Sequence, residues 1–250
     1  MSVLSDIDGP AATVTLDWPA KRNAMGPAEA NELSDALRAA ADVASVKAIV
    51  ITGNGAFCAG GDINGMVARA DMPPEERRAL VYSAYQGMIR TVIGLPVPTI
   101  AAIDGPAVGM GFDLALACDH RIFGPAGWAR QGWGAIGLIP GTGGELLLRL
   151  RSPSALWRLL PGQRKVDADL AEKLGLGEAA ATDTARESAL QMVASLAKHT
   201  RATLEGYVAL HRSDLRALLE DHLALCLATQ VTLLSDPEFR NRAAAAVAPR

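Results

Sequence analysis

The chain has 250 residues, of which 50% are hydrophobic and 20% are charged, and its formal net charge is −3. This length suits one large domain, or one domain with a small appendage, and this composition supports a buried core and argues against disorder. No cluster of Lys and Arg stands out, so we expect no nucleic acid as a partner.

The cysteines and the first residues indicate a compartment. Cys58, Cys118 and Cys226 are far apart and form no CxxC pair, which fits a reducing environment and argues against a disulfide frame or a metal site. The first residues carry acids where a signal peptide carries bases, and we expect no apolar run long enough to span a bilayer. We therefore predict a cytoplasmic protein without a membrane partner.

The first half of the chain alternates between strand and helix patterns. Strands are predicted where apolar and polar residues alternate or where a short β-branched run occurs, and helices where apolar residues recur at steps of three and four. In chain order, we predict a strand over 12–18, a helix over 26–41, a strand over 47–52, a helix over 73–94, a strand over 99–104, a helix over 111–118 and a strand over 121–123. Such alternation is typical of an α/β fold with a mostly parallel sheet.

The second half is predicted to be almost entirely helical from Gly143 onward. We divide the chain into a ligand-binding core over residues 1–190 and a helical region over residues 191–250 that serves oligomerisation and covers the pocket. The region from Ala202 to Leu234 is rich in leucine, for example at Leu218 and Leu225, and is too apolar for one small domain to hide easily. We therefore predict a homotrimer or a dimer of trimers.

Two glycine-rich stretches follow predicted buried strands. They read "GAFCAGGDIN" (55–64) and "GPAVGMGFDL" (105–114). Neither completes a dinucleotide-binding GxGxxG, because Cys58 and Leu114 stand at the third glycine position, and the chain contains no phosphate-binding GxxxxGK[ST] and no GxSxG nucleophile elbow.

Bare backbone offers main-chain N–H groups instead. Loops that follow parallel strands meet at one edge of the sheet, so two N–H groups can converge on a single oxygen. Such a pair forms an oxyanion hole, which stabilises the charge that develops on a carbonyl. We expect one donor at Gly61 and the second at the start of the helix that follows the second stretch, where the helix dipole adds positive potential.

Several motifs, in order along the chain, resemble the crotonase (enoyl-CoA hydratase/isomerase) superfamily. They are "KRNAM" (21–25), "FCAGGDI" (57–63), "IDGPAVGMGFDLALACDHRI" (103–122), "IGLIPGTGG" (136–144) and "LPGQRKVDADLAEKLGLGEAA" (160–180). The resemblance implies a crotonase-like repeated ββα spiral, with C-terminal helices that build trimers or hexamers. It also implies an acyl-CoA thioester as ligand, with coenzyme A as part of the substrate and no separate cofactor.

The resemblance also assigns roles to residues. It places the oxyanion N–H groups on Gly61 and Met110 and a catalytic carboxylate on Asp113. The substrate-binding residues that it implies are Ala24, Ala59, Gly60, Asp62, Ile63, Asn64, Gly109 and Trp133. Two of the acids also have a structural interpretation, because Asp113 lies in the first turn of a predicted helix and Asp62 stands where it would cap the turn that follows.

The chain departs from the superfamily at the acid–base residues. Hydratases of the superfamily carry two glutamates, and these positions fall on Asp113 and Trp133. One carboxylate can move a proton between two carbons, whereas hydration also needs a held and activated water. We therefore expect an acyl-CoA enzyme of the enoyl-CoA hydratase/isomerase type that stabilises a thioester enolate. The alternatives are a catalytically weak acyl-CoA-binding paralogue and a different enolate reaction of the superfamily.

Overall fold

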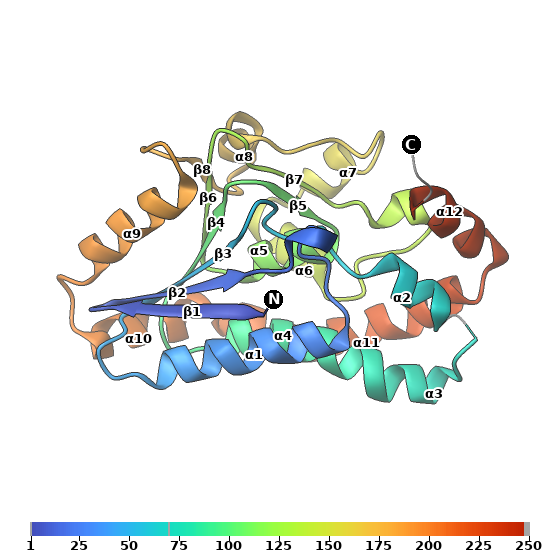
Figure 1. The fold of residues 1–250 in the computed structure, drawn as a ribbon, viewed down its shortest axis with the longest axis horizontal. Helices are drawn as coiled ribbons and strands as arrows, with labels where there is room; N and C mark the ends of the chain where they lie inside the picture. The colour runs from blue at the N-terminus through green and yellow to red at the C-terminus, as the bar shows by residue number, and fades with distance from the viewer. Residues whose placement is uncertain (1, 70, 248–250) are drawn as a thin grey trace.

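A six-stranded sheet forms the centre of the fold, in the order β1-β2-β3-β4-β6-β8 (Figure 1). The structure is a computed structural model that describes residues 2–69 and 71–247. The strands are β1 (Val3–Asp8), β2 (Ala11–Leu16), β3 (Ala48–Gly53), β4 (Thr99–Ile103), β6 (His120–Phe123) and β8 (Glu178–Ala179). Only the β1–β2 pair is antiparallel among these described strands, so the predicted mostly parallel sheet is confirmed.

After each of the strands β3, β4 and β6, the chain enters a second, smaller sheet. It pairs β5 (Pro106–Val108) with β7 (Trp128–Arg130), and single bridges from Cys58 to Ala107 and from Ala129 to Val166 extend it. Strands β3, β4 and β6 are thus each followed by a segment of the second sheet. A helix or helical turn comes next in each case, namely α2 (Ile63–Ala68), α5 (Met110–Ala117) and the 3₁₀-helical turn η3 (Trp133–Ile136). This is the repeated ββα unit that the sequence predicts.

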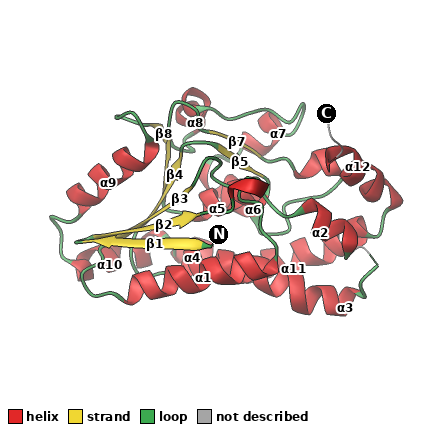
Figure 2. Cartoon of the chain, viewed as in Figure 1, coloured by secondary structure: helices red, strands yellow, loops and turns green. Residues whose placement is uncertain are grey.

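The two faces of the central sheet are covered by different helices (Figure 2). Helices α1 (Pro27–Asp42) and α4 (Ser83–Gly94) pack together on one face, and α9 (Ala185–Leu196) covers the other. Because successive strand residues point to opposite faces, Ile49 and Ile51 join the larger core, whereas Val50 packs with the smaller core under α9. The short β-branched run of β3 is buried on both faces, as expected for a central parallel strand.

The remaining helical elements connect and cover this framework. They are η1 (Pro19–Lys21), α3 (Pro74–Arg77), the π-helical turn η2 (Arg78–Tyr82), α6 (Gly144–Arg151), α7 (Ala155–Leu159), α8 (Ala168–Leu174), α10 (Arg201–His211), α11 (Ser213–Leu234) and α12 (Pro237–Val247). The predicted helix over 73–94 is confirmed as α3, η2 and α4 in succession. Strands β1, β5, β7 and β8 were not predicted from the sequence.

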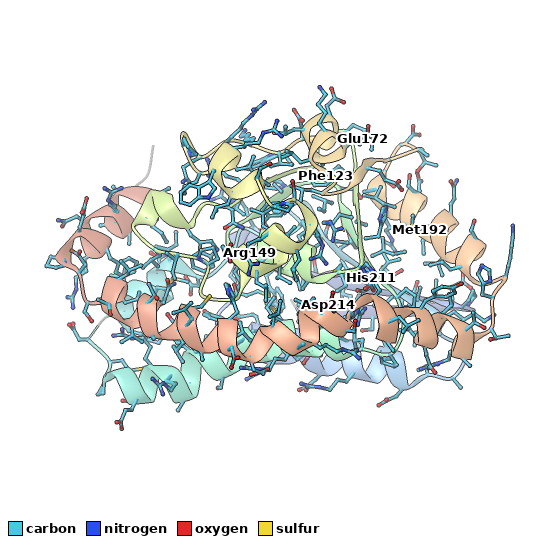
Figure 3. The ribbon with its side chains drawn as sticks, turned by 180° about the vertical axis from the view of Figure 1, so that it is seen from behind. Phe123, Arg149, Glu172, Met192, His211 and Asp214 are labelled. Carbon is cyan, nitrogen blue, oxygen red and sulfur yellow. The ribbon has the colours of Figure 1, made fainter. Side chains whose placement is uncertain are left out.

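The C-terminal helices follow one another along the back of the molecule, with His211 and Asp214 at the junction of α10 and α11 (Figure 3). Arg212 between them is 2% exposed, and its Nε donates to Asp119 Oδ1 at 2.8 Å. Its Nη1 also donates to the carbonyl of Leu95 at 2.8 Å. This single side chain therefore fastens the C-terminal helices to the core. The predicted boundary at residue 190 falls inside α9, and the division into two domains stays a prediction.

Helix α11 contradicts one expectation. By length and apolar composition alone, Ser213–Leu234 is the one helix in the described parts of the chain that could cross a membrane. The expectation that no apolar run is long enough to do so is therefore wrong. Residues Leu215, Leu219 and Leu223 of this helix are buried, whereas Leu218 and Leu225 are exposed, so one side packs on the protein and another does not.

Candidate active site

The first glycine-rich loop is held by a bridge to the segment before α1. Met25 N donates to Gly60 O at 2.9 Å, and Asp62 N donates to Met25 O at 2.9 Å. These two bonds use the backbone groups on either side of Gly61. Because successive backbone groups of an extended segment point in opposite directions, the N–H of Gly61 is turned away from Met25.

The second loop is held between the first loop and β7. Val108 N donates to Cys58 O at 2.9 Å, and Gly109 N donates to Arg130 O at 2.9 Å. Met110 is the first residue of α5, where the N–H has no partner inside the helix. Within the described residues, neither the Gly61 N–H nor the Met110 N–H has a hydrogen-bond acceptor.

Glycine precedes each of these two donors for a steric reason. Gly60 has a φ of +102° and Gly109 a φ of +55°, which side chains rarely tolerate. A Cβ on Gly60 would also stand 2.6 Å from Val108 O, in the facing loop. The bare backbone thus lets the two loops approach each other, and Gly61 and Met110 line the same pocket.

This first pocket contains most of the predicted binding residues. Gly61 and Met110 line it, together with five of the eight predicted substrate-binding residues: Ala59, Gly60, Ile63, Gly109 and Trp133. Ala24, Asp62 and Asn64 are not part of its lining. Asp62 is the N-cap residue of α2, but its carboxylate accepts no capping hydrogen bond, so its interpretation as a side-chain cap is wrong.

Several basic and aromatic residues at the pocket were not predicted as binding residues from the sequence. Arg22, Arg130 and Trp128 line the pocket, and Lys165 Nζ lies 4.3 Å from the Trp128 ring centroid. These side chains come from three separate segments, since Trp128 and Arg130 share β7 while Arg22 and Lys165 lie elsewhere in the chain, and so no local motif joins them. They give this pocket a positive rim.

Asp113 is fully buried and accepts three side-chain hydrogen bonds. Thr142 Oγ1 donates to its Oδ2 at 2.6 Å and Trp133 Nε1 donates to the same oxygen at 3.0 Å. Gln131 Nε2 donates to Oδ1 at 3.2 Å. Helix α6 closes the remaining side, because a Cβ on Gly144 would stand 1.8 Å from Oδ1.

Burial dominates the electrostatics of Asp113. It raises the pKa of this carboxyl to about 7, although the hydrogen bonds from Thr142, Trp133 and Gln131 each act to lower it. None of the described ion pairs involves Asp113. Both protonation states are therefore accessible near neutral pH, as a group that accepts and returns a proton requires.

Sequence reasoning found Asp113 and Trp133 but not the bond between them. The resemblance places the two hydratase acids at Asp113 and Trp133, and in the fold the indole N–H of Trp133 donates to the Asp113 carboxylate. Gln131 and Thr142 were also missed. The "GTGG" segment was used as a family motif, but nothing local in it indicates that its threonine reaches α5.

A second pocket lies on the other side of Trp133 and Met66, which line both pockets. The space inside it that a water-sized group can occupy is about 30 Å³. Its lining residues are Met66, Arg69, Arg77, Val81, Tyr82, Tyr85, Trp133, Leu138, Gly141, Thr142, Gln230 and Leu234. Met66 also lies directly on Gly61, because its Cε is 2.2 Å from the place of a Cβ there. Since Met is flexible, it can move to connect the two pockets.

Comparisons with known proteins agree on one family. The model of the enoyl-CoA hydratase/isomerase family matches residues 7–242. "Probable enoyl-CoA hydratase EchA14" of Mycobacterium tuberculosis is 35% identical over 98% of this chain and 96% of its own. "2,3-dehydroadipyl-CoA hydratase" of Escherichia coli is 33% identical over 84% of this chain and 82% of its own. An enoyl-CoA hydratase crystal structure from Bacillus halodurans superposes with a TM-score of 0.90 at 22% identity, over 98% of this chain and 100% of the other, which shows the shared fold.

Proposed function

Because the chain belongs to the enoyl-CoA hydratase/isomerase family, we propose that it binds an enoyl-CoA thioester with the carbonyl oxygen on the N–H groups of Gly61 and Met110. The support is that these two donors have no acceptor within the described residues and line the same pocket. Donors that are fixed in advance stabilise the negative charge of an enolate without reorganisation. The positive rim of Arg22 and Arg130 suits the phosphates of coenzyme A, which is part of the substrate.

We further propose that Asp113 transfers the proton. In a 3-enoyl-CoA, its carboxylate removes a proton from C2, and the electron pair forms the enolate on the thioester oxygen. The enolate then collapses with the double bond between C2 and C3, and the carboxyl returns the proton to C4. This shift needs one proton carrier, and the observation that supports it is a single buried carboxyl with a pKa near 7 behind the shared wall of the two pockets.

Hydration is the less suitable reaction for this site. Within the described residues, neither pocket is lined by an acid, and the indole N–H of Trp133 is a donor with no usable basicity. A second group that could hold and deprotonate water is therefore missing from both linings. Trp133 instead presents a flat apolar face to the acyl group.

A catalytically weak acyl-CoA binder is the second candidate, and one observation favours it. Both oxygens of Asp113 already accept hydrogen bonds, and Trp133 and Thr142 lie between this carboxyl and the second pocket. Proton transfer therefore requires one of these side chains to turn aside when the acyl group enters.

Incubation with 3-hexenoyl-CoA separates the two candidates. Many turnovers to 2-hexenoyl-CoA, followed by chromatography, support the enzyme. Retention of about one ester per chain after gel filtration, without conversion, supports the binder. If the protein neither converts nor retains the ester, the CoA-thioester proposal is wrong.

We also propose that the C-terminal helices cover the pockets and build a homotrimer or a dimer of trimers in the cytoplasm. Ala246 of α12 lines the first pocket, and Gln230 and Leu234 of α11 line the second. The exposed Leu218 and Leu225 support an association surface on α11. Light scattering at micromolar concentration checks the assembly, and a monomer there would overturn it.

A further inference from the structure

The second pocket combines apolar walls with two arginines. Val81, Leu138 and Leu234 supply apolar surface, and Arg69 and Arg77 supply positive charge. No acid is found among the described residues that line it. An acyl chain that passes between Trp133 and Met66 would therefore meet guanidinium groups in a largely apolar surrounding.

Arg69 is the less satisfied of the two arginines. Its backbone caps the end of α2, and its guanidinium packs over Gly65, where a Cβ would stand 2.9 Å from Nη2. The Nε and Nη2 atoms are buried and donate to none of the described residues. Buried donors without acceptors are costly, and more so when the group is charged.

Asp62 lies near Arg69 but forms no ion pair with it among the described ion pairs. Asp62 lies on the same side of Gly65, with Oδ2 at 2.7 Å from the place of that Cβ. The ion pairs of the described chain nevertheless include none between Asp62 and Arg69. Asp62 is also absent from the lining of the pocket. The charge that faces the acyl chain is therefore that of the arginine.

Arg77 adds a second positive charge to the same wall. It is 5% exposed, and its Nη2 donates to Met72 O at 2.9 Å and to Arg69 O at 3.3 Å. These two bonds to carbonyl oxygens orient the guanidinium. The bond to Arg69 O holds the chain at Arg69 in place.

We propose that the acyl group of the substrate carries a carboxylate at the end remote from the thioester, and that this carboxylate accepts hydrogen bonds from Arg69. The assignment rests on the proposed function for the CoA end of the ligand, and it names the class of acyl group. A carboxylate matches the fork of a guanidinium and supplies the acceptors that Nε and Nη2 lack. A methyl-ended chain would leave both groups buried and unpaired.

Binding of matched pairs of esters to the wild-type protein tests the assignment. Each pair consists of a methyl-ended 2-enoyl-CoA and the ω-carboxyl 2-enoyl-CoA of the same length, with five, six or eight acyl carbons. Calorimetric titration gives Kd without requiring turnover. We expect the carboxyl-ended ester to bind about 10- to 100-fold more tightly in at least one pair. This ratio of Kd values corresponds to the usual contribution of a hydrogen bond to a charged group.

The other outcomes separate two failures. Equal binding of both esters in every pair, or tighter binding of the methyl-ended ones, overturns the assignment and leaves the CoA-thioester function standing. If none of the esters binds, the proposed function fails, and the assignment fails with it.

A pair of variants locates the effect on Arg69. Arg69→Met keeps the length and removes the charge, and we expect it to abolish the preference for the carboxyl-ended ester while binding of the methyl-ended ester is kept. Arg78→Met is the matched control, because Arg78 is exposed, lies on the same segment and does not line the pocket. An unchanged preference in Arg69→Met, or an equal loss in both variants, would contradict the role of Arg69.

Discussion

The two halves of the candidate site are built from different parts of the chain. The backbone half consists of the N–H groups of Gly61 and Met110, two residues that line one pocket and whose N–H groups have no acceptor in the described structure. The side-chain half consists of Asp113, whose two oxygens are already held by three donors. The two N–H groups therefore suit any thioester carbonyl. The protonation of Asp113, in contrast, depends on the side chains around it, and the kind of reaction depends on this carboxyl.

Residues of both halves follow a glycine at the same place in the ββα repeat. Glycines with positive φ precede Gly61, Met110 and Trp133 at the same place in three successive repeats, namely Gly60, Gly109 and Gly132. In the third repeat, Trp133 N donates to Gln131 O at 2.8 Å. The backbone N–H of Trp133 is therefore already used. The third repeat instead supplies the Trp133 indole, whose N–H donates to Asp113.

The largest effect is expected when the side-chain half is disabled. Asp113→Asn keeps the volume but removes the proton carrier, so turnover of a 3-enoyl-CoA should fall by about 10²–10⁴-fold. Binding of the ester should be kept, because the backbone half is untouched. Steady-state kinetics and titration of the same preparation measure both, and an unchanged rate would reduce Asp113 to a helix-terminus acid.

The stability of Asp113→Asn gives an independent check on the same carboxyl. Because burial raises the pKa of Asp113 from its ordinary 3.8 to about 7, the folded state binds more protons than the unfolded state between these values. The contribution of Asp113 to the free energy of unfolding is therefore full at low pH and is lost as pH rises toward 7. Urea unfolding should show this decline in the wild type and a weaker one in the variant.

The backbone half is tested at Gly61. Gly61→Pro removes the N–H and should cost about 3–4 kcal/mol of transition-state stabilisation. Gly61→Ala is the matched control, because its Cβ meets the same flexible Met66 side chain while the N–H remains. If the folded proline variant turns over as fast as the alanine variant, the oxyanion hole lies elsewhere.

A smaller effect is expected at the hydrogen bond from Trp133 to Asp113. Trp133→Phe keeps an aromatic wall but removes the donor to Asp113, which acts to lower the pKa of this carboxyl. The pKa should therefore rise, the acid limb of the pH–rate profile should move to higher pH, and the rate at pH 7 should fall by about tenfold or less. A limb that stays in place would show that the indole only fills space.

The binding half of the site could be predicted from sequence, and much of the chemical half could not. Glycines after buried strands indicate backbone donors because steric rules act locally, and the register of parallel strands places the loops together. The contact between Trp133 and Asp113 depends on how η3 turns after β7, across a separation of 20 residues. Short strands such as β5 and β7 carry too few residues to show a period, so the second sheet that sets this contact was also missed.

Longer elements were predicted well, because they contain enough residues to show a period. Helix α1 and strands β3 and β4 appear where their periodicity indicates, since each buries a continuous face. The anchor formed by Arg212 depends on packing between distant segments, because its partner Asp119 lies 93 residues away along the chain. No single stretch of sequence carries that information.

We propose that the carboxyl of Asp113 moves a proton and does not activate water. The most direct test compares, in the wild-type protein, the kcat/KM for isomerisation of 3-hexenoyl-CoA with that for hydration of crotonyl-CoA. We expect the kcat/KM for isomerisation to exceed that for hydration, and to rise with pH through about 7 as Asp113 ionises. Brisk hydration of crotonyl-CoA with little or no isomerisation would contradict it.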